Sequence, residues 1–473
     1  MKTNFDLLIV GAGPAGMAAA ITAARAGLTV AVFDEQPAVG GQVFRAIESA
    51  HLDPVLNGAH ADEGRQLAAE FHATDGVAYF PRSTVWHIDL PDLNAVGEDL
   101  VQISVVKENS SQVFSGRRVL LATGAQERPM PIPGWTLPGV MSAGAAQILL
   151  KTSGAVPHRP TVIAGQGPLC WLIAVQLLRA GAQDLHFVET TPRGRLGKAI
   201  SSSAWWRGLP LLHEGWKLIQ EARRRKLFVI HNAKNLKILG TDHVTGISWE
   251  GGSIACRTVL LHDGVIPSTH ISRALGLPHQ WHSTQQYWQP TVDEWGATPH
   301  AQVAIAGDGN GIKGWQAAAG QGRLAALDAA LRLGTLTAGQ RDEQAAPLRG
   351  LLSKFVAARP FLDILYAPYS APPEQIPDST IVCRCEEVSA GQVRQAIKMG
   401  ATGPNQIKAF LRAGMGPCQG RMCATTVAAL TACELKVPVE HIDALRPRAP
   451  FKPLTVGALI GLQPKTAPHK KAE

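Results

Sequence analysis

The chain has 473 residues, of which 45% are hydrophobic and 17% charged, so it has enough apolar material for two to four domains with buried cores. Its 47 glycines and 32 prolines follow no repeat, which excludes collagen-like, coiled-coil and disordered chains. The net charge is +8, but much of it lies in a basic C-terminal tail, residues 446–473, which has six Lys or Arg against one acidic residue. The other basic cluster, residues 223–226, has no aromatic residues interleaved with it, so we predict no nucleic-acid partner.

The start of the chain lacks the apolar segment of a secretory signal, because Met1–Asp6 leads directly into a strand pattern and a glycine loop. Two uncharged runs, 129–150 and 160–178, are long enough to resemble membrane spans. Prolines interrupt the first run, and the sequence Gly165–Pro168 splits the second. We therefore predict a cytoplasmic protein without a transmembrane segment, and we leave open a peripheral association with the inner face of the membrane.

The first predicted elements form a βαβ unit, with a buried strand at Phe5–Val10, a helix at Met17–Ala26 and a second strand at Thr29–Phe33. The loop Gly11-Ala12-Gly13-Pro14-Ala15-Gly16 joins the first strand to the helix. Its first glycine makes the turn, its second lets a pyrophosphate approach the backbone, and its third lets the helix pack closely on the strand. Asp34 and Glu35 end the second strand, where Asp34 can accept hydrogen bonds from ribose hydroxyls. The unit predicts a dinucleotide-binding domain.

Three further segments resemble those that hold FAD in the two-dinucleotide flavoproteins, the superfamily of thioredoxin reductase and glutathione reductase. Leu120–Gly124 is a strand that ends in the Ala-Thr-Gly turn found next to the flavin in those proteins, and 303–309 ends in a Gly-Asp pair whose carboxylate holds the ribityl chain there. Gly40-Gly41-Gln42 resembles the turn that lies along the isoalloxazine. The resemblance implies FAD at the first site, held by Gly11, Gly13, Pro14, Ala15, Gly16, Asp34, Glu35, Gly41, Gln42, Arg45, Thr123, Gly124, Gly307 and Asp308.

A second nucleotide-binding pattern follows at Thr161–Val188, with the loop Gly165-Gln166-Gly167-Pro168-Leu169-Cys170 and Glu189 at the end of its second strand. Cys170 is larger than the small residue that close packing of helix on strand requires, and Glu189 would repel the 2′-phosphate of NADPH. Two interpretations stay open: the unit binds NADH, or it keeps the fold and no longer binds a nicotinamide cofactor. We favour the second. Cys170 and Cys256 have no partner thiol nearby in the sequence, so the chain does not resemble a disulfide reductase.

Four cysteines in two close pairs follow a proline-rich linker: Cys383 and Cys385, then Cys418 and Cys423. Two short helices are predicted between the pairs, the first capped by Ser389, and a third helix starts near Cys423. Four thiolates held by a small helical unit suit a [2Fe-2S] cluster. Structural zinc, two disulfides and four inert thiols are the alternatives; zinc usually takes more widely spaced cysteine pairs, and disulfides are unusual in a reducing compartment.

The cysteine segment resembles the bacterioferritin-associated-ferredoxin-like (BFD-like) [2Fe-2S] domain, and the whole chain resembles one group of proteins, through segments such as 414–421 and 453–459. The group comprises the A or alpha subunits of octopine and nopaline oxidases, the B subunit of hydrogen cyanide synthase, and the alpha subunit of dye-linked D-hydroxyproline and L-proline dehydrogenases. The resemblance implies two partners: an FAD-containing beta subunit of the glycine or D-amino-acid oxidase type that oxidises the substrate, and a small [2Fe-2S] ferredoxin-like subunit. Some relatives also hold a second flavin, FMN, at the subunit interface.

The predicted fold is α/β, of the two-dinucleotide-binding flavoprotein class, with a small helical [2Fe-2S] domain. We assign residues 1–150 and 280–340 to the FAD-binding domain, 151–279 to the NAD(P)-binding-like domain, 341–377 to a linker, 378–445 to the BFD-like domain and 446–473 to the tail. No catalytic residue stands out. The predicted function is therefore electron transfer within a heteromeric amino- or imino-acid dehydrogenase. The alternatives are a stand-alone NADH-dependent flavoprotein reductase and a zinc-stabilised assembly protein.

Overall fold

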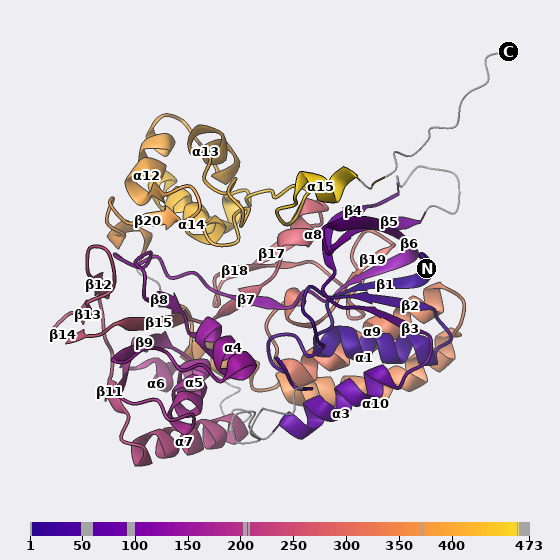
Figure 1. The fold of residues 1–473 in the computed structure, drawn as a ribbon, viewed down its shortest axis with the longest axis horizontal. Helices are drawn as coiled ribbons and strands as arrows, with labels where there is room; N and C mark the ends of the chain where they lie inside the picture. The colour runs from indigo at the N-terminus through magenta and orange to yellow at the C-terminus, as the bar shows by residue number, and fades with distance from the viewer. Residues whose placement is uncertain are drawn as a thin grey trace.

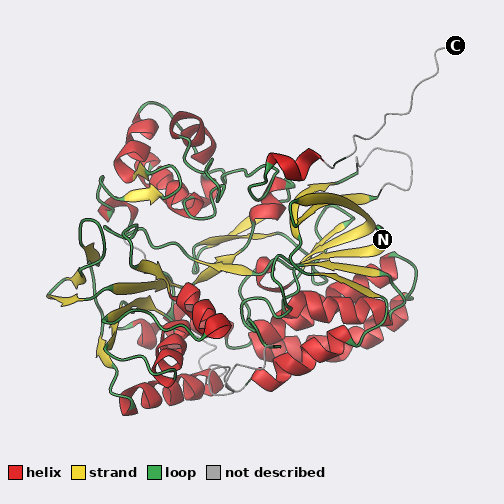
Figure 2. Cartoon of the chain, viewed as in Figure 1, coloured by secondary structure: helices red, strands yellow, loops and turns green. Residues whose placement is uncertain are grey.

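The protein is described by a computed structural model that covers residues 2–48, 60–91, 100–201, 206, 209–369, 372–460 and 462. Figure 1 shows two α/β layered regions side by side, with a small helical domain above one of them in this view and a segment that leads from it across to the other. Figure 2 shows that strands form the centre of both larger regions and that helices cover them. The arrangement confirms the predicted α/β class with a separate helical unit.

The first region is built on a sheet with the strand order β3-β2-β1-β6-β5-β4, in which β19 also pairs with β6. Its central strands run parallel, and β4, β5 and β6 form antiparallel pairs. The strands are β1 (Asn4–Val10), β2 (Val30–Phe33), β3 (Val77–Phe80), β4 (Thr84–Asp89), β5 (Val101–Lys107), β6 (Ser110–Leu121) and β19 (Val303–Ile305). Four helices gather on one face in Figure 1, namely α1 (Pro14–Arg25), α3 (Ala61–His72), α9 (Trp315–Arg332) and α10 (Ala338–Val356).

Close packing of α1 on α9 depends on small residues. A Cβ on Gly322 of α9 would lie 2.1 Å from the carbonyl oxygen of Ala15, so no larger residue fits there. Alanines of both helices are buried in one core cluster with Leu7 and Ile9 of β1. This packing brings the N-terminal end of α1 to the carboxyl ends of β1, β6 and β19, the edge where ligands bind in open α/β sheets.

The second region has a five-stranded parallel sheet with the order β11-β10-β9-β15-β8. Its first strand, β8 (Val140–Ser142), lies before the predicted domain boundary at residue 151, and α4 (Ala143–Ser153) spans that boundary. The other elements are β9 (Thr161–Gln166), α5 (Pro168–Arg179), β10 (Leu185–Glu189), α6 (Arg195–Ile200), α7 (Leu209–Arg224), β11 (Phe228–Ile230) and β15 (Thr258–Asp263).

Short antiparallel ribbons connect the two regions. The ribbon of β7 (Ala125–Glu127) and β16 (Val265–Pro267) carries the chain out of the first region and back. Up to residue 332, the two regions and their connections also contain β12 (Lys237–Leu239), β13 (Gly246–Trp249), β14 (Gly252–Ala255), α8 (His270–Ala274), β17 (His279–His282), β18 (Tyr287–Pro290) and the 3₁₀ helix η2 (Gly307–Asn310).

The segment predicted as a linker is largely helical and packed. α10 contributes Ala345 to a core cluster with Leu324 and Leu327 of α9. α11 (Arg359–Leu365) buries Phe361 and Leu365 against Ala199 of α6 in the second region, and η3 (Pro373–Gln375) follows. Residues 341–365 therefore join the two nucleotide-binding regions instead of simply leading to the small domain.

The small domain contains β20 (Ile381–Cys383), β21 (Val388–Ser389), α12 (Ala390–Lys398), α13 (Pro404–Leu411), α14 (Ala424–Leu435) and η4 (Val439–His441). The predicted helices are confirmed, and so is the Ser389 cap, whose hydroxyl accepts from the N–H of Gln392 at 3.3 Å. At its start, Trp135 Nε1 donates to the carbonyl of Ile381 at 2.6 Å, which ties the small domain to the second region.

The first part of the predicted basic tail returns to the first region. Phe451 is buried in the core under β1, β5 and β6, and its N–H donates to the carbonyl of Trp86 at 2.8 Å. Lys452 Nζ lies 2.7 Å from a carboxylate oxygen of Glu35, and the short helix α15 (Val456–Ile460) follows. Within the described residues, no helix has the length and apolar character needed to span a membrane.

Candidate functional site

The first glycine loop is shaped for a close ligand. A Cβ on Gly16 would lie 1.8 Å from the carbonyl oxygen of Gly11, and a Cβ on Gly11 would lie 2.5 Å from that of Ala122, so both glycines are needed for strand and helix to meet. Gly13 is different, because a Cβ there would meet only Gly41 Cα, at 3.7 Å. The N-terminus of α1 has no side-chain cap, which leaves its N–H groups to an anion.

Asp34 lies directly beside this loop. One of its carboxylate oxygens accepts from the N–H of Ala12 at 2.6 Å, and the other accepts from Gln36 at 2.7 Å. Burial raises the pKa of Asp34, while these two backbone hydrogen bonds act in the opposite direction. Glu35 points elsewhere, to Lys452 in the C-terminal segment. The structure thus brings Asp34, but not the Glu35 carboxylate, to the loop.

The segments predicted to contact the flavin converge at the ends of β1, β6 and β19. A Cβ on Gly309 would lie 3.5 Å from Thr123 Oγ1 and from the carbonyl oxygen of Gly124, and a Cβ on Gly307 would lie 2.8 Å from the Cβ of Ala15. The Asp308 carboxylate accepts from the N–H groups of Lys313 and Gly314 at 2.9 and 3.2 Å, and burial raises its pKa.

The turn at residues 40–45 lies against the glycine loop. Gly41 has a φ of +62°, and a Cβ there would lie 3.0 Å from Gly13 Cα, so the turn closes directly over the glycine loop. Gln42 accepts from Arg45 at 3.1 Å, and Arg45 is buried with its Nε unpartnered. Converging glycine turns, an uncapped helix N-terminus and a buried arginine with one unpartnered N–H fit a dinucleotide pyrophosphate and its flavin.

The four cysteines of the small domain lie together at the ends of β20 and α14. Cys383 and Cys423 are buried, Cys418 is half-buried and Cys385 is exposed. The thiols interact as two pairs, Cys383 with Cys423 and Cys385 with Cys418, and charge on any one affects the others. In the part of the chain that is described, no three His, Cys, Asp or Glu side chains converge to hold a single metal ion.

The surroundings of Cys383 favour a thiolate. The Cys423 thiol donates to its sulfur and three backbone N–H groups point at it, from Gly414, Glu386 and Cys385, so its pKa falls to about 6 although burial acts in the opposite direction. A Cβ on Gly416 would lie 2.3 Å from Cys385 Cβ, so a glycine is needed where the chain passes this sulfur. Two thiol pairs with aimed N–H groups match the two-iron, four-cysteine donor set of a [2Fe-2S] cluster.

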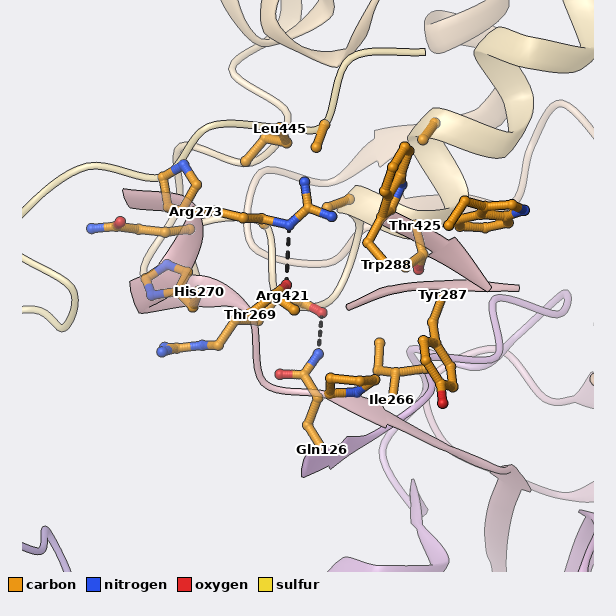
Figure 3. Close-up of a pocket in the computed structure, with 18 of the residues that line it drawn as sticks. Gln126, Ile266, Thr269, His270, Arg273, Tyr287, Trp288, Arg421, Thr425 and Leu445 are labelled. Carbon is orange, nitrogen blue, oxygen red and sulfur yellow. Dashed lines mark hydrogen bonds between the residues drawn. The ribbon is translucent and has the colours of Figure 1, made fainter. Parts of the chain in front are cut away.

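A direct contact joins β7, the strand that follows the Ala-Thr-Gly turn, to the cysteine loop. Gln126 of β7, two residues after Gly124, donates from Nε2 to the backbone carbonyl of Arg421 at 2.8 Å, and Arg421 is two residues before Cys423 (Figure 3). A cavity of about 70 Å³ lies beside this contact, between β7, β16, α8 and the cysteine loop. Sequence patterns did not single out Gln126, because a lone glutamine after a strand carries no motif.

The same cavity has an aromatic and cationic wall. Arg273 lies over the ring of Trp288, with its guanidinium carbon 5.6 Å from the ring centroid, and its Nε donates to Thr269 Oγ1 at 3.0 Å (Figure 3). Burial lowers the pKa of Arg273 to about 10, which leaves it charged at neutral pH. These residues also escaped prediction, since nothing in their sequence spacing relates α8 to β18.

Comparison with known proteins agrees with this geometry. Residues 5–322 match the family described as pyridine nucleotide-disulphide oxidoreductase, and residues 381–432 match the BFD-like [2Fe-2S] binding domain. The chain therefore belongs to the pyridine nucleotide-disulphide oxidoreductase family and is an FAD-dependent oxidoreductase with a [2Fe-2S] domain.

Its similarity to individual proteins extends over almost the whole chain. It is 42% identical to the A subunit of opine oxidase from Agrobacterium tumefaciens (strain Ach5), across 99% of this chain and 93% of that protein. It is 31% identical to the HcnB subunit of hydrogen cyanide synthase from Pseudomonas aeruginosa, across 97% and 99%. The crystal structure of L-proline dehydrogenase from P. horikoshii has the same fold, with a TM-score of 0.70 at 20% identity, across 97% of this chain and 80% of that one. The resemblance predicted from the motifs is confirmed.

Proposed function

We propose that this chain is the electron-transfer subunit of a heteromeric flavin-dependent amino- or imino-acid dehydrogenase. Its relatives include subunits of opine oxidase and hydrogen cyanide synthase, each similar over nearly the full length. The observation that carries the proposal is the Gln126–Arg421 hydrogen bond, which links the flavin groove to the cysteine loop within one chain. Electrons delivered to the flavin site would pass to the thiols within this one chain.

Particular residues would hold each group. The N–H groups at the start of α1 would bind the FAD pyrophosphate, Asp34 the ribose and Asp308 the ribityl chain, while Gly41, Thr123 and Gly124 would line the flavin ring. Cys383, Cys385, Cys418 and Cys423 would hold the two irons. When bound, FAD supplies two-electron chemistry and the cluster supplies single-electron steps. Cys170 and Cys256 are both buried, in different core clusters, so together they offer no dithiol for disulfide chemistry.

The partners follow from the relatives. An FAD-containing beta subunit of the glycine or D-amino-acid oxidase type would oxidise the substrate, and a small [2Fe-2S] ferredoxin-like subunit would complete the complex, with FMN as a further flavin at an interface. We place the complex in the cytoplasm, in contact with the inner face of the membrane or free of it. Co-purification, flavin quantitation before and after separation of subunits, and cell fractionation test these assignments.

The first experiment determines what the isolated chain contains and what reduces it. We expect flavin, iron and sulfide in an anaerobic preparation, and no bleaching of the flavin by opines, glycine or hydroxyproline until the beta subunit is added. Bleaching without that subunit would overturn the division of labour. Zinc without iron or sulfide would favour an assembly protein, and rapid reduction by NADH would favour a stand-alone reductase.

A second experiment tests the path between the sites. Replacing Gln126 by alanine should slow transfer from photoreduced flavin to the cluster severalfold, because the contact with the Arg421 carbonyl is lost. Gln112→Ala is the matched control, since Gln112 is an exposed glutamine on β6. Cofactor contents of both variants should equal those of the unaltered chain. An unchanged transfer rate in Gln126→Ala would contradict the role of this contact.

A further inference from the structure

The second nucleotide-binding region has an unusual neighbour at its ligand edge. In the sheet order β11-β10-β9-β15-β8, the chain reverses direction of winding between β9 and β15, so the crevice for a dinucleotide lies at the carboxyl ends of these two strands. Gln166 ends β9 and Asp263 ends β15, and the two residues are paired in register. Any dinucleotide would have to cross this pair.

Residues 366–369, which follow α11, are bonded to both ends of the crevice. Gln166 Nε2 donates to the carbonyl of Ala367 at 2.7 Å and to Asp263 Oδ1 at 2.9 Å. The N–H of Tyr369 donates to the same Asp263 oxygen at 3.0 Å. Arg195 of α6 donates to the carbonyls of Ala367 and Pro368. The side chains at the carboxyl ends of β9 and β15 are thus bonded to the chain itself, whereas the N-terminus of α5, like that of α1, has no side-chain cap.

Burial of the loop agrees with this occupation. Gly165 and Gly167 are buried, whereas the matching Gly11 and Gly13 of the first loop are half-buried; the next residue, Pro168, is exposed. Gly165 keeps its glycine for packing, because a Cβ there would lie 1.7 Å from the carbonyl oxygen of His262. Packing therefore explains the first glycine of the second loop, and the φ of +103° at Gly167 favours glycine there whether or not a ligand is bound.

The ribose end is occupied as well. The Glu189 carboxylate pairs with His231 Nδ1 at 2.5 Å and accepts from Thr191 at 3.3 Å. Tyr366 is close enough to Glu189 and Cys170 for their charges to act on its phenol, and burial is the larger cause that raises its pKa to about 12. The segment from Tyr366 to Tyr369 consequently extends from the end of β10, past β9, to β15.

We propose that residues 366–369 take the place of a dinucleotide in the second region and keep nicotinamide cofactors out. The segment is an internal plug: its carbonyls use the donors Gln166 and Arg195, and its Tyr369 N–H uses Asp263. The proposal is independent of the electron-transfer role proposed above, because it concerns only what this crevice binds.

The test compares NADH binding with the mobility of the plug. In the unaltered chain, calorimetry should detect no saturable NADH binding at the second region, and the Tyr369 amide should exchange slowly with and without NADH. The double variant Gln166→Ala/Arg195→Ala removes both donors to Ala367, so the Tyr369 amide should exchange faster and NADH should bind at least about tenfold more tightly than to the unaltered chain. Lys198→Ala, an exposed cation on the same helix, is the control and should behave like the unaltered chain.

Each outcome decides the matter. Saturable NADH binding by the unaltered chain, or faster Tyr369 exchange when NADH is added to it, would overturn the proposal. It would also be overturned if exchange in the double variant stayed slow, or if exchange became fast and NADH still failed to bind. None of these results depends on whether the flavin passes electrons to the cluster, so failure of the plug and failure of the electron-transfer role are distinguishable.

Discussion

The two nucleotide-binding regions share a glycine pattern, a strand–loop–helix unit and an acidic residue at the end of the second strand, yet they differ in what covers the loop. The first loop is half-buried and faces a groove built by β6, β19 and the turn at residues 40–45. The first three residues of the second loop are buried, and Gln166 among them is bonded to Ala367. The difference teaches that a glycine signature reports close packing of strand and helix, and that ligand binding depends on what the rest of the chain places above it.

The largest expected effect is on FAD affinity, when the second glycine of each loop is replaced by alanine. Gly13→Ala has room for its Cβ and an ordinary φ, so the fold should persist, but the methyl group would stand in the path of the pyrophosphate and lower FAD affinity about 100-fold. Gly167→Ala also has room, with its nearest neighbour at 3.9 Å, and its φ of +103° adds strain of about 1–2 kcal/mol. Flavin content should be unchanged in Gly167→Ala, and flavin fluorescence titration of both apoproteins checks the pair. Equal flavin loss in both variants would contradict the comparison.

A smaller effect is the loss of folding stability in acid, and it depends on His279 of β17. Burial lowers the pKa of His279 to about 4 from 6.5, with the charge of Arg273 as a further cause, so the folded protein binds fewer protons than the unfolded chain between these values. The stabilisation is complete above about pH 6.5 and is lost as the pH falls towards 4, which amounts to about 1–2 kcal/mol between pH 7 and pH 5. Urea unfolding at both pH values measures it, and His279→Gln should reduce the pH dependence by that amount. A variant with the full dependence would show that another group is responsible.

The smallest expected effect distinguishes the acids at the strand ends. Asp34→Asn should weaken FAD binding about tenfold, because in our proposal the carboxylate beside Ala12 accepts from the ribose. Glu189→Gln should leave FAD binding within about twofold, since it lies in the second region. Glu35→Gln should do the same and change the free energy of unfolding by less than about 1 kcal/mol, because its pair with Lys452 is exposed. Apoprotein titration with FAD ranks the three, and a large loss in Glu35→Gln would restore that residue to the site.

Much of the fold could be predicted because its elements carry local signals. The buried strand at the N-terminus, the Ala-rich α1 and α9, the Ser389 cap and the cysteine spacing all depend on residues close together in the sequence. The motif residues Gly13, Thr123 and Asp308 follow the ends of β1, β6 and β19, which are neighbours in one sheet.

Contacts between distant segments could not be predicted in the same way. The plug at residues 366–369 looked like part of a linker, because backbone carbonyls that fill a crevice leave no side-chain pattern. Gln126 and Arg421 meet although they lie 295 positions apart in the sequence, and Phe451 lies in a stretch whose charge suggested only a tail. Such tertiary contacts depend on how whole domains pack, which neither periodicity nor motif spacing records.

Phe451 also determines how the small domain can move. The domain is attached to the second region at its beginning, through Trp135 and Ile381, and to the first region at its end, through Phe451. A domain attached at both ends is not free to move between two distant binding positions. If the chain has the proposed electron-transfer role, an external acceptor would have to approach it at the exposed Cys385 edge, and encounter at that edge would govern how fast electrons leave.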